Sequence, residues 1–96
     1  MTFDDLTFVT HPNHGLGVQA TAFFPNGYGV SVIKSQYSYG GEAGFYEAAV
    51  FAGDADNHSL TYDTPVTDDV EGWLSPEAVT EFVQKVEALP SRSVSA

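Results

Sequence analysis

The stretch LGVQATAFFPNGYGVSVIKS, residues 16–35, decides the fold. Its first part, up to Phe24, alternates apolar residues with polar or small ones, which is typical of a strand with one buried face. Asn26-Gly27 then forms a strong hairpin signal, because both residues tolerate positive φ. The chain returns as a partner strand from Tyr28 to Ser35, in which Ile33 breaks the alternation. The stretch therefore predicts an antiparallel hairpin whose second strand is either buried on both faces or apolar on its outer face.

Shorter strands are predicted on both sides of this hairpin. They are expected at Leu6–Thr10, Phe45–Phe51 and Leu60–Asp63, between segments rich in Gly, Pro, Asn and Asp. Glu47-Ala48-Ala49 could instead begin a helix, so the run from Phe45 has a second interpretation. Thr64-Pro65 is expected to end the last strand, because proline cannot donate to a strand ladder.

The clearest element is a helix near the end of the sequence. Ser75-Pro76-Glu77 supplies an N-cap oxygen, a proline at the first helical position and an acid in the first turn. The following residues place apolar side chains on one helix face: Val79, Phe82, Val83, Val86 and Leu89. Pro90 is expected to end the helix. The sequence thus predicts an α+β fold, an antiparallel meander of about four to five strands packed against one C-terminal helix.

Length and composition predict a single domain over residues 1–90, with a flexible tail over residues 91–96. The 96 residues are 43% hydrophobic and 14% aromatic, which is too apolar for a disordered acidic segment. There is no cysteine, so disulfides and thiolate chemistry are excluded and a reducing cytoplasm is favoured. The N-terminal MTFDD does not resemble a signal peptide, and no apolar run approaches the roughly 20 residues of a membrane span.

The acidic imbalance limits the class of partner. Thirteen Asp and Glu stand against three Lys and Arg, and the formal net charge is -10. No basic residue lies between Lys34 and Lys85. Such a one-signed field repels nucleic acid, phosphates and anionic membranes and attracts basic surfaces. We therefore expect a basic protein surface as the partner and no direct binding to nucleic acid or membrane. A homo-oligomer remains open.

Two groups of residues are candidates for the partner surface. The first is a cluster of acids shortly before the helix, with no Lys or Arg near them in sequence: Asp63, Asp68, Asp69 and Glu71. The second lies in the loop YSYGGEAG, residues 37–44, and consists of Tyr37, Tyr39 and Glu42. Tyrosines among glycines can form an adaptable contact surface, although their rings could equally cap the sheet core with the hydroxyls at the surface. Trp73 is expected to fill the helix–sheet seam.

No catalytic, metal or cofactor site is predicted. His11 and His14 have an H-x-x-H spacing and His58 is a third histidine, but a metal site needs three or four convergent ligands. The segment from Asp54 to His58 resembles the start of a calcium loop without its downstream Gly and Glu. No G-x-S-x-G elbow or phosphate loop occurs. We therefore expect a protein that is not an enzyme and has no cofactor.

Three segments resemble a group of small uncharacterised proteins encoded by tailed bacteriophages. They are PNGYGVSVIK (25–34), YSYGGEAGFYEAAVF (37–51) and YDTPVTDDVEGWL (62–74), and the similarity spans Phe23 to Leu74. No activity is established for that group, so the resemblance assigns no functional residue. It implies a phage product in the cytoplasm of the host bacterium.

Charge and resemblance together lead to a hypothesis about function. The protein would be a non-enzymatic phage accessory protein that binds a host or phage protein through its acidic surface. In its sharpest form it would mimic nucleic acid, with carboxylates occupying the basic groove of a host nucleic-acid-binding or defence protein. Two alternatives stay open. The acidity could serve solubility alone, or the apolar strands around Ile33 and Val50 could assemble the chain into a structural homo-oligomer.

Overall fold

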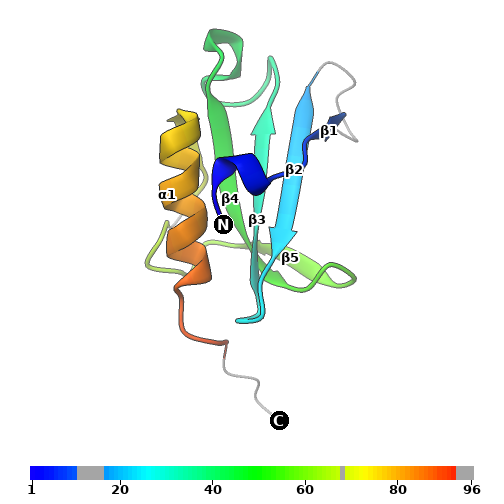
Figure 1. Ribbon diagram of the computed structural model, residues 1–96, viewed down its shortest axis with the longest axis vertical. Coiled ribbons are helices and arrows are strands. Elements are labelled where there is room, and N and C mark those ends of the chain that lie inside the picture. The colour runs from blue at the N-terminus through cyan, green and yellow to red at the C-terminus, as the bar shows by residue number, and fades with distance from the viewer. Residues whose placement is uncertain (11–16, 68, 93–96) are drawn as a thin grey trace.

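A computed structural model of the chain describes residues 1–10, 17–67 and 69–92 (Figure 1). It contains two short 3-10 helices, a six-stranded antiparallel sheet and one α-helix: η1 Phe3–Asp5, β1 Val9–Thr10, β2 Val18–Phe23, β3 Tyr28–Lys34, η2 Gly41–Ala43, β4 Tyr46–Gly53, β5 His58–Thr61, β6 Glu71–Leu74 and α1 Pro76–Glu87. Strands β1 to β5 are neighbours in chain order, and β6 also pairs with β4. The predicted α+β class is confirmed, as is a meander with a C-terminal helix.

The β2–β3 hairpin is confirmed, but its turn differs from the predicted one. The N–H of Phe24 donates to the Tyr28 carbonyl at 2.8 Å, and the N–H of Gly27 donates to the Phe24 carbonyl at 3.2 Å. Gly27 has φ 86°, whereas Asn26 is not among the described residues with positive φ. Pro25 presets the φ of the first turn position, so the loop is a turn over Pro25-Asn26 followed by a left-handed glycine. This longer loop replaces the tight Asn-Gly turn.

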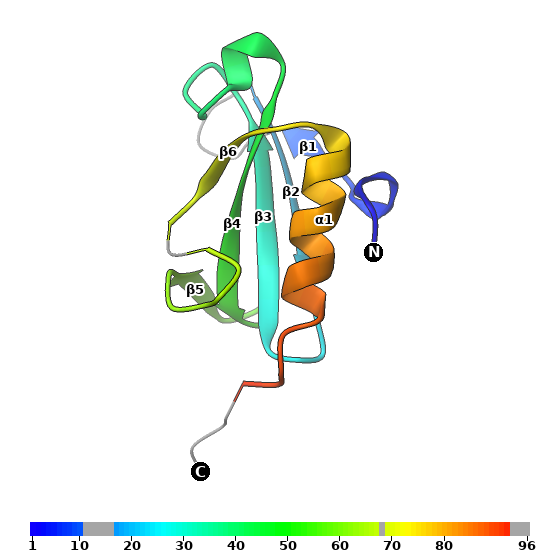
Figure 2. The same cartoon turned by 90° about the vertical axis from the view of Figure 1, so that its left-hand side faces the viewer.

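The core lies between one face of the sheet and α1. Cross-strand neighbours share a face, and the pairs Val30↔Val50 and Val32↔Ala48 form the floor of this core. The helix lies over β3 and β4 (Figure 1 and Figure 2) and contributes Val79, Phe82, Val83 and Val86, all buried. The predicted apolar stripe is therefore confirmed. Burial of each such side chain stabilises the fold by about 1.5–3 kcal/mol.

Side chains cap both ends of α1: Ser75 at its start and Asn26 at its end. The Ser75 hydroxyl accepts a hydrogen bond from the Ala78 N–H at 3.2 Å, which confirms the predicted N-cap. The helix ends at Glu87 with Ala88 as its C-cap, two residues before Pro90, which agrees with the predicted stop. Asn26 Nδ2 lies 2.9 Å from the Val86 oxygen, 3.2 Å from that of Glu87 and 3.1 Å from that of Leu89. The turn of the hairpin thus caps the end of the helix, in addition to the stop at Pro90.

The segment after Pro90 also meets the hairpin. The N–H of Arg92 donates to the Asn26 carbonyl at 2.9 Å. The remainder of the predicted tail, residues 93–96, lies outside the described residues.

The N-terminal segment closes one side of the core. The rings of Phe3, Phe8 and Tyr46 lie with centroids 5.1 to 5.5 Å apart. The N–H of Phe3 donates to the Thr80 hydroxyl on α1 at 2.8 Å. Hydrogen bonds from the main-chain N–H and the hydroxyl of Thr2 hold the pKa of Asp5 below its ordinary value.

The strand predicted from Phe45 is confirmed as β4, and the alternative of a helix beginning at Glu47 is wrong, because pairing with β3 buries Ala48 and Val50 in the sheet. Two other predicted strands need correction. The strand expected at Leu60–Asp63 lies at His58–Thr61, opposite Val50–Gly53. The strand expected at Leu6–Thr10 shortens to Val9–Thr10. Strand β6 was not predicted at all. It forms by pairing Leu74 with Tyr46 and Glu71 with Ala48 across a register shift.

Candidate protein-binding surface

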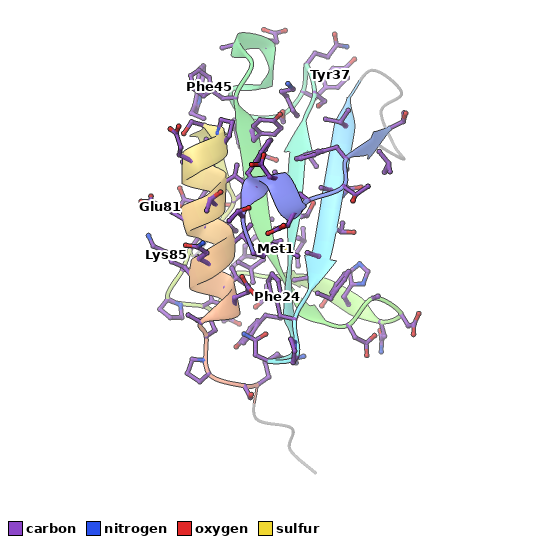
Figure 3. All side chains as sticks on the ribbon, in the orientation of Figure 1. Met1, Phe24, Tyr37, Phe45, Glu81 and Lys85 are labelled. Carbon is purple, nitrogen blue, oxygen red and sulfur yellow. The ribbon has the colours of Figure 1, made fainter. Side chains whose placement is uncertain are left out.

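The β3–β4 loop and the last part of β6 meet at one end of the molecule, where four aromatic side chains are exposed. Their exposed fractions are 69% for Tyr37, 64% for Tyr39, 37% for Phe45 and 63% for Trp73. We call these four residues the aromatic end. Figure 3 shows Tyr37 and Phe45 on either side of the loop that holds η2. Exposed aromatics grouped in this way are typical of interaction sites.

Main-chain hydrogen bonds hold the β3–β4 loop against β4 and β6 at the aromatic end. The N–H of Tyr39 donates to the Glu47 carboxylate at 3.2 Å, and its carbonyl accepts from the N–H of Trp73 at 3.1 Å. The β3–β4 loop and β6 approach each other so closely that only glycine fits at Gly40 and Gly72. A Cβ on Gly72 would lie 2.4 Å from that of Tyr39, and a Cβ on Gly40 would lie 3.0 Å from Trp73 Cα. The loop and β6 are therefore one packed unit.

Trp73 does not fill the helix–sheet seam, so that prediction is wrong. Leu74 takes the inward position against the core, and Trp73 points outward beside Phe45, with ring centroids 5.9 Å apart. Trp73 has φ 57° and is the one non-glycine residue with positive φ among those described. This conformation costs about 1–2 kcal/mol for an L-residue. In a strand, Trp73 shares a face with the charged Glu71, and Leu74 lies on the opposite face. This alternation in the sequence could have predicted that the indole is exposed to solvent.

Glu42 stands next to Trp73 in space. It is exposed in η2 and lines a pocket of about 330 Å³ together with Gln36, Ser38, Gly40, Ala43 and Trp73. Within residues 1–10, 17–67 and 69–92, the Glu42 carboxylate has neither a hydrogen bond nor an ion pair. Two predicted surface residues of the β3–β4 loop, Tyr39 and Glu42, therefore lie beside Trp73, which was expected to fill the helix–sheet seam.

The predicted acidic cluster is only partly brought to this end. Glu71 is exposed at the start of β6 and shares that strand with Trp73. Asp63 and Asp69 are exposed in the β5–β6 segment, which Figure 2 shows beside β5 and away from η2. The buried hydroxyls of Thr64 and Thr67 organise this segment: Thr64 donates to the Thr67 carbonyl at 3.4 Å, and Thr67 to the Asp69 carbonyl at 2.8 Å. Asp68 lies outside the described residues.

A second pocket of about 180 Å³ lies between α1 and β6. Its apolar lining comes from Val66, Leu74, Ala78 and Phe82, and its charged residues are Glu71, Glu81 and Lys85. Figure 3 shows Glu81 and Lys85 on the outer side of α1. The ammonium group of Lys85 gives this pocket a cation of its own.

The outer face of the sheet bears on the homo-oligomer alternative. Val50 is 1% exposed and faces the core, so its side chain does not contribute to this outer face. Ile33 pairs with Glu47 and Gln19 on the opposite face, where it is half-buried. Exposed apolar side chains on that face are Val9 and Leu60.

The histidines and acids form no metal centre in the described ranges. No group of three or more His, Cys, Asp or Glu residues there could hold an ion. His58 packs against the stacked rings of Phe23 and Phe51, with centroids 4.8 and 4.4 Å away, and its Nδ1 is 2.9 Å from the Asp54 carbonyl oxygen. His11 and His14 fall outside these ranges. In the same part of the chain, no helix is both long enough and apolar enough to cross a bilayer.

Comparisons of the chain with protein-family models, curated proteins and solved structures found no match. The resemblance to phage proteins therefore stays a prediction from the sequence.

Proposed function

We propose that the protein is a binding module that docks a basic surface of a partner protein on its aromatic end. The observation behind this proposal is that exposed Trp73, Tyr39 and Phe45 adjoin the unpaired carboxylate of Glu42. Large aromatic side chains supply most of the binding energy in many interfaces. Carboxylates around them steer a basic partner and set its orientation.

The distribution of charge supports a basic partner. The one ion pair among the described residues joins the Met1 ammonium group to Glu87, at 2.6 Å. Each of the three Lys and Arg residues is occupied elsewhere: Lys34 Nζ lies 4.9 Å from the centroid of the Tyr46 ring, Lys85 lines the pocket beside α1, and Arg92 contacts the hairpin turn. Among the described residues, Glu42 therefore has no cation beside it, whereas Glu71 shares the pocket beside α1 with Lys85.

A finer form of the proposal names the partner class. The protein would act without catalysis in a bacterial cytoplasm as a phage accessory protein, occupying the basic groove of a host nucleic-acid-binding or defence protein. Support for this form comes from the net charge of -10, because such grooves obtain much of their affinity from neutralising phosphates. The same charge opposes self-association, which makes the homo-oligomer the weaker candidate.

The test begins with capture of a partner from bacterial lysate and continues with binding kinetics on the purified pair. Glu42→Gln with Glu71→Gln removes two charges at the aromatic end and should slow association and flatten its salt dependence. Trp73→Gly should speed dissociation by roughly tenfold or more. A matched control, Asp56→Asn with Asp63→Asn, removes two exposed charges from the β4–β5 turn and the segment after β5, away from the aromatic end.

The control separates a local site from general attraction. If the control pair slows association as much as the Glu42/Glu71 pair, the net charge acts as a whole and the aromatic end is not the site. If Trp73→Gly leaves the dissociation rate unchanged, the aromatic anchor is wrong.

A further inference from the structure

The pocket beside Trp73 has the size and lining of a site for one side chain. Its volume of about 330 Å³ lies at the lower end of the range for ligand pockets, roughly 300–1,000 Å³. Trp73, whose side chain is 63% exposed, and Glu42 are both lining residues of this pocket. Gln36 adds an amide that makes no hydrogen bond within the described part of the chain.

These groups match the chemistry of a guanidinium ion. A guanidinium stacks on the face of an indole, and tryptophan gives the strongest such contact among the aromatic side chains. Its N–H groups form a planar fork that fits the two oxygens of a carboxylate such as Glu42. The amide oxygen of Gln36 is a further acceptor for the remaining donors. A lysine ammonium would use the charge but not the planar geometry.

The chain supplies no cation to this pocket. None of its three Lys and Arg residues is among the lining residues, whereas the pocket beside α1 already contains Lys85. An incoming cation therefore meets no competing cation in the Trp73 pocket, whereas the carboxylates of the other pocket, Glu71 and Glu81, already have Lys85 beside them.

We propose that the Trp73–Glu42 pocket binds an arginine side chain presented by a basic segment of the partner protein. This inference rests on the proposed function, since it names the residue of the partner that the aromatic end recognises. Arginine anchors of this kind are common at the centres of interfaces.

The test uses the single tryptophan of the chain as the reporter. The probe is the blocked peptide Gly-Gly-Arg-Gly-Gly, and the readout is the indole N–H resonance of Trp73 in a low-salt NMR titration. We expect a saturable shift with a Kd in roughly the millimolar range, as for one charged side chain in a shallow site. The matched peptide with citrulline, a neutral isostere of arginine, should bind at least about tenfold more weakly, and the lysine peptide should be intermediate.

Variants then assign the site. Glu42→Gln should weaken binding of the arginine peptide by roughly tenfold, while Asp56→Asn, at the opposite end, should leave it unchanged. Trp73→Gly should abolish the response, read from the main-chain amide of Ala43, with resonance dispersion showing that the fold is intact. Equal binding of the citrulline or lysine peptide, no effect of Glu42→Gln, or no shift at tens of millimolar peptide would each overturn the arginine site.

The two proposals fail in distinguishable ways. If the purified partner is sensitive to Trp73→Gly while the arginine peptide does not bind, this inference is wrong and the proposed function stands. If the arginine peptide binds in the pocket while Trp73→Gly and Glu42→Gln leave the binding kinetics of the partner unchanged, the arginine site stands and the proposed function is wrong.

Discussion

The side chain of Asn26 joins the β2–β3 turn to the end of α1. Its Nδ2 donates to helix carbonyls and its Oδ1 accepts from the Tyr28 N–H at 3.0 Å. Asn26→Ala leaves part-buried groups unpaired, so the free energy of unfolding should fall by about 1–3 kcal/mol in urea denaturation. Asn26→Asp should cost at least as much, because a carboxylate cannot donate and is repelled by the negative end of the helix dipole. The control is Asn57→Ala in the exposed β4–β5 turn, and an equal loss there would refute the capping role.

Trp73 combines an exposed indole with a conformation that favours glycine. Trp73→Gly removes the cost of φ 57° and loses the contact with Phe45, so the free energy of unfolding should stay within about 1 kcal/mol of the wild type. Trp73→Val should destabilise more, because a β-branched residue is least tolerated at positive φ. Unfolding followed by circular dichroism measures both variants. A loss of about 3–5 kcal/mol for Trp73→Gly, as for a core tryptophan, would contradict the exposed placement.

The β2–β3 turn depends on the left-handed conformation of Gly27. Gly27→Val introduces a β-branched residue at φ 86°, where its Cβ would also lie 3.3 Å from the side chain of Arg92. The strain of about 1–2 kcal/mol should lower the melting temperature clearly. Gly27→Asn is the matched control, since asparagine tolerates this conformation best among the other residues. Equal melting temperatures for Gly27→Val and the wild type would contradict the left-handed conformation of Gly27 in this turn.

The helix holds to the sheet through its buried stripe. Phe82 is 6% exposed at the centre of that stripe, so Phe82→Ala should reduce the free energy of unfolding by about 3–5 kcal/mol. Gln84→Ala, on the exposed side of the same helix, should change it by no more than about 0.5 kcal/mol. Chemical denaturation of the two variants checks this contrast. A cost below roughly 1 kcal/mol for Phe82→Ala would mean that the stripe faces a partner instead of the core.

The molecule as a whole carries uncompensated negative charge. With a net charge of -10 and one ion pair in its described part, repulsion among the acids destabilises the compact state. Salt shortens the Debye length from about 10 Å at 0.1 M to about 3 Å at 1 M. The urea midpoint should therefore rise as NaCl is added, and the rise should be smaller for Asp56→Asn with Asp63→Asn. A midpoint that falls with salt would show that attractive pairs dominate.

Local patterns in the sequence were sufficient for the hairpin and the helix. The alternation in β2, the Pro-Asn-Gly turn and the capped apolar stripe of α1 each involve residues close in the chain, so short-range physics determines them. The class of fold followed from these elements. From the candidate surface, Tyr39, Glu42 and Glu71 were recognisable as exposed and polar or aromatic residues between predicted elements.

Long-range contacts decided the rest. The carbonyl of Glu87 at the end of α1 is capped by Asn26, which is 61 residues earlier in the chain. Strand β6 has a weak sequence signal and forms only by pairing with β4, and that pairing turns Trp73 outward against Tyr39 and Gly40. Such pairings join segments far apart in the chain, and no local propensity encodes which segments meet. The sequence by itself therefore determined the elements and the charge, whereas the tertiary structure brought Trp73 and Glu42 to one pocket and left Asp63 elsewhere.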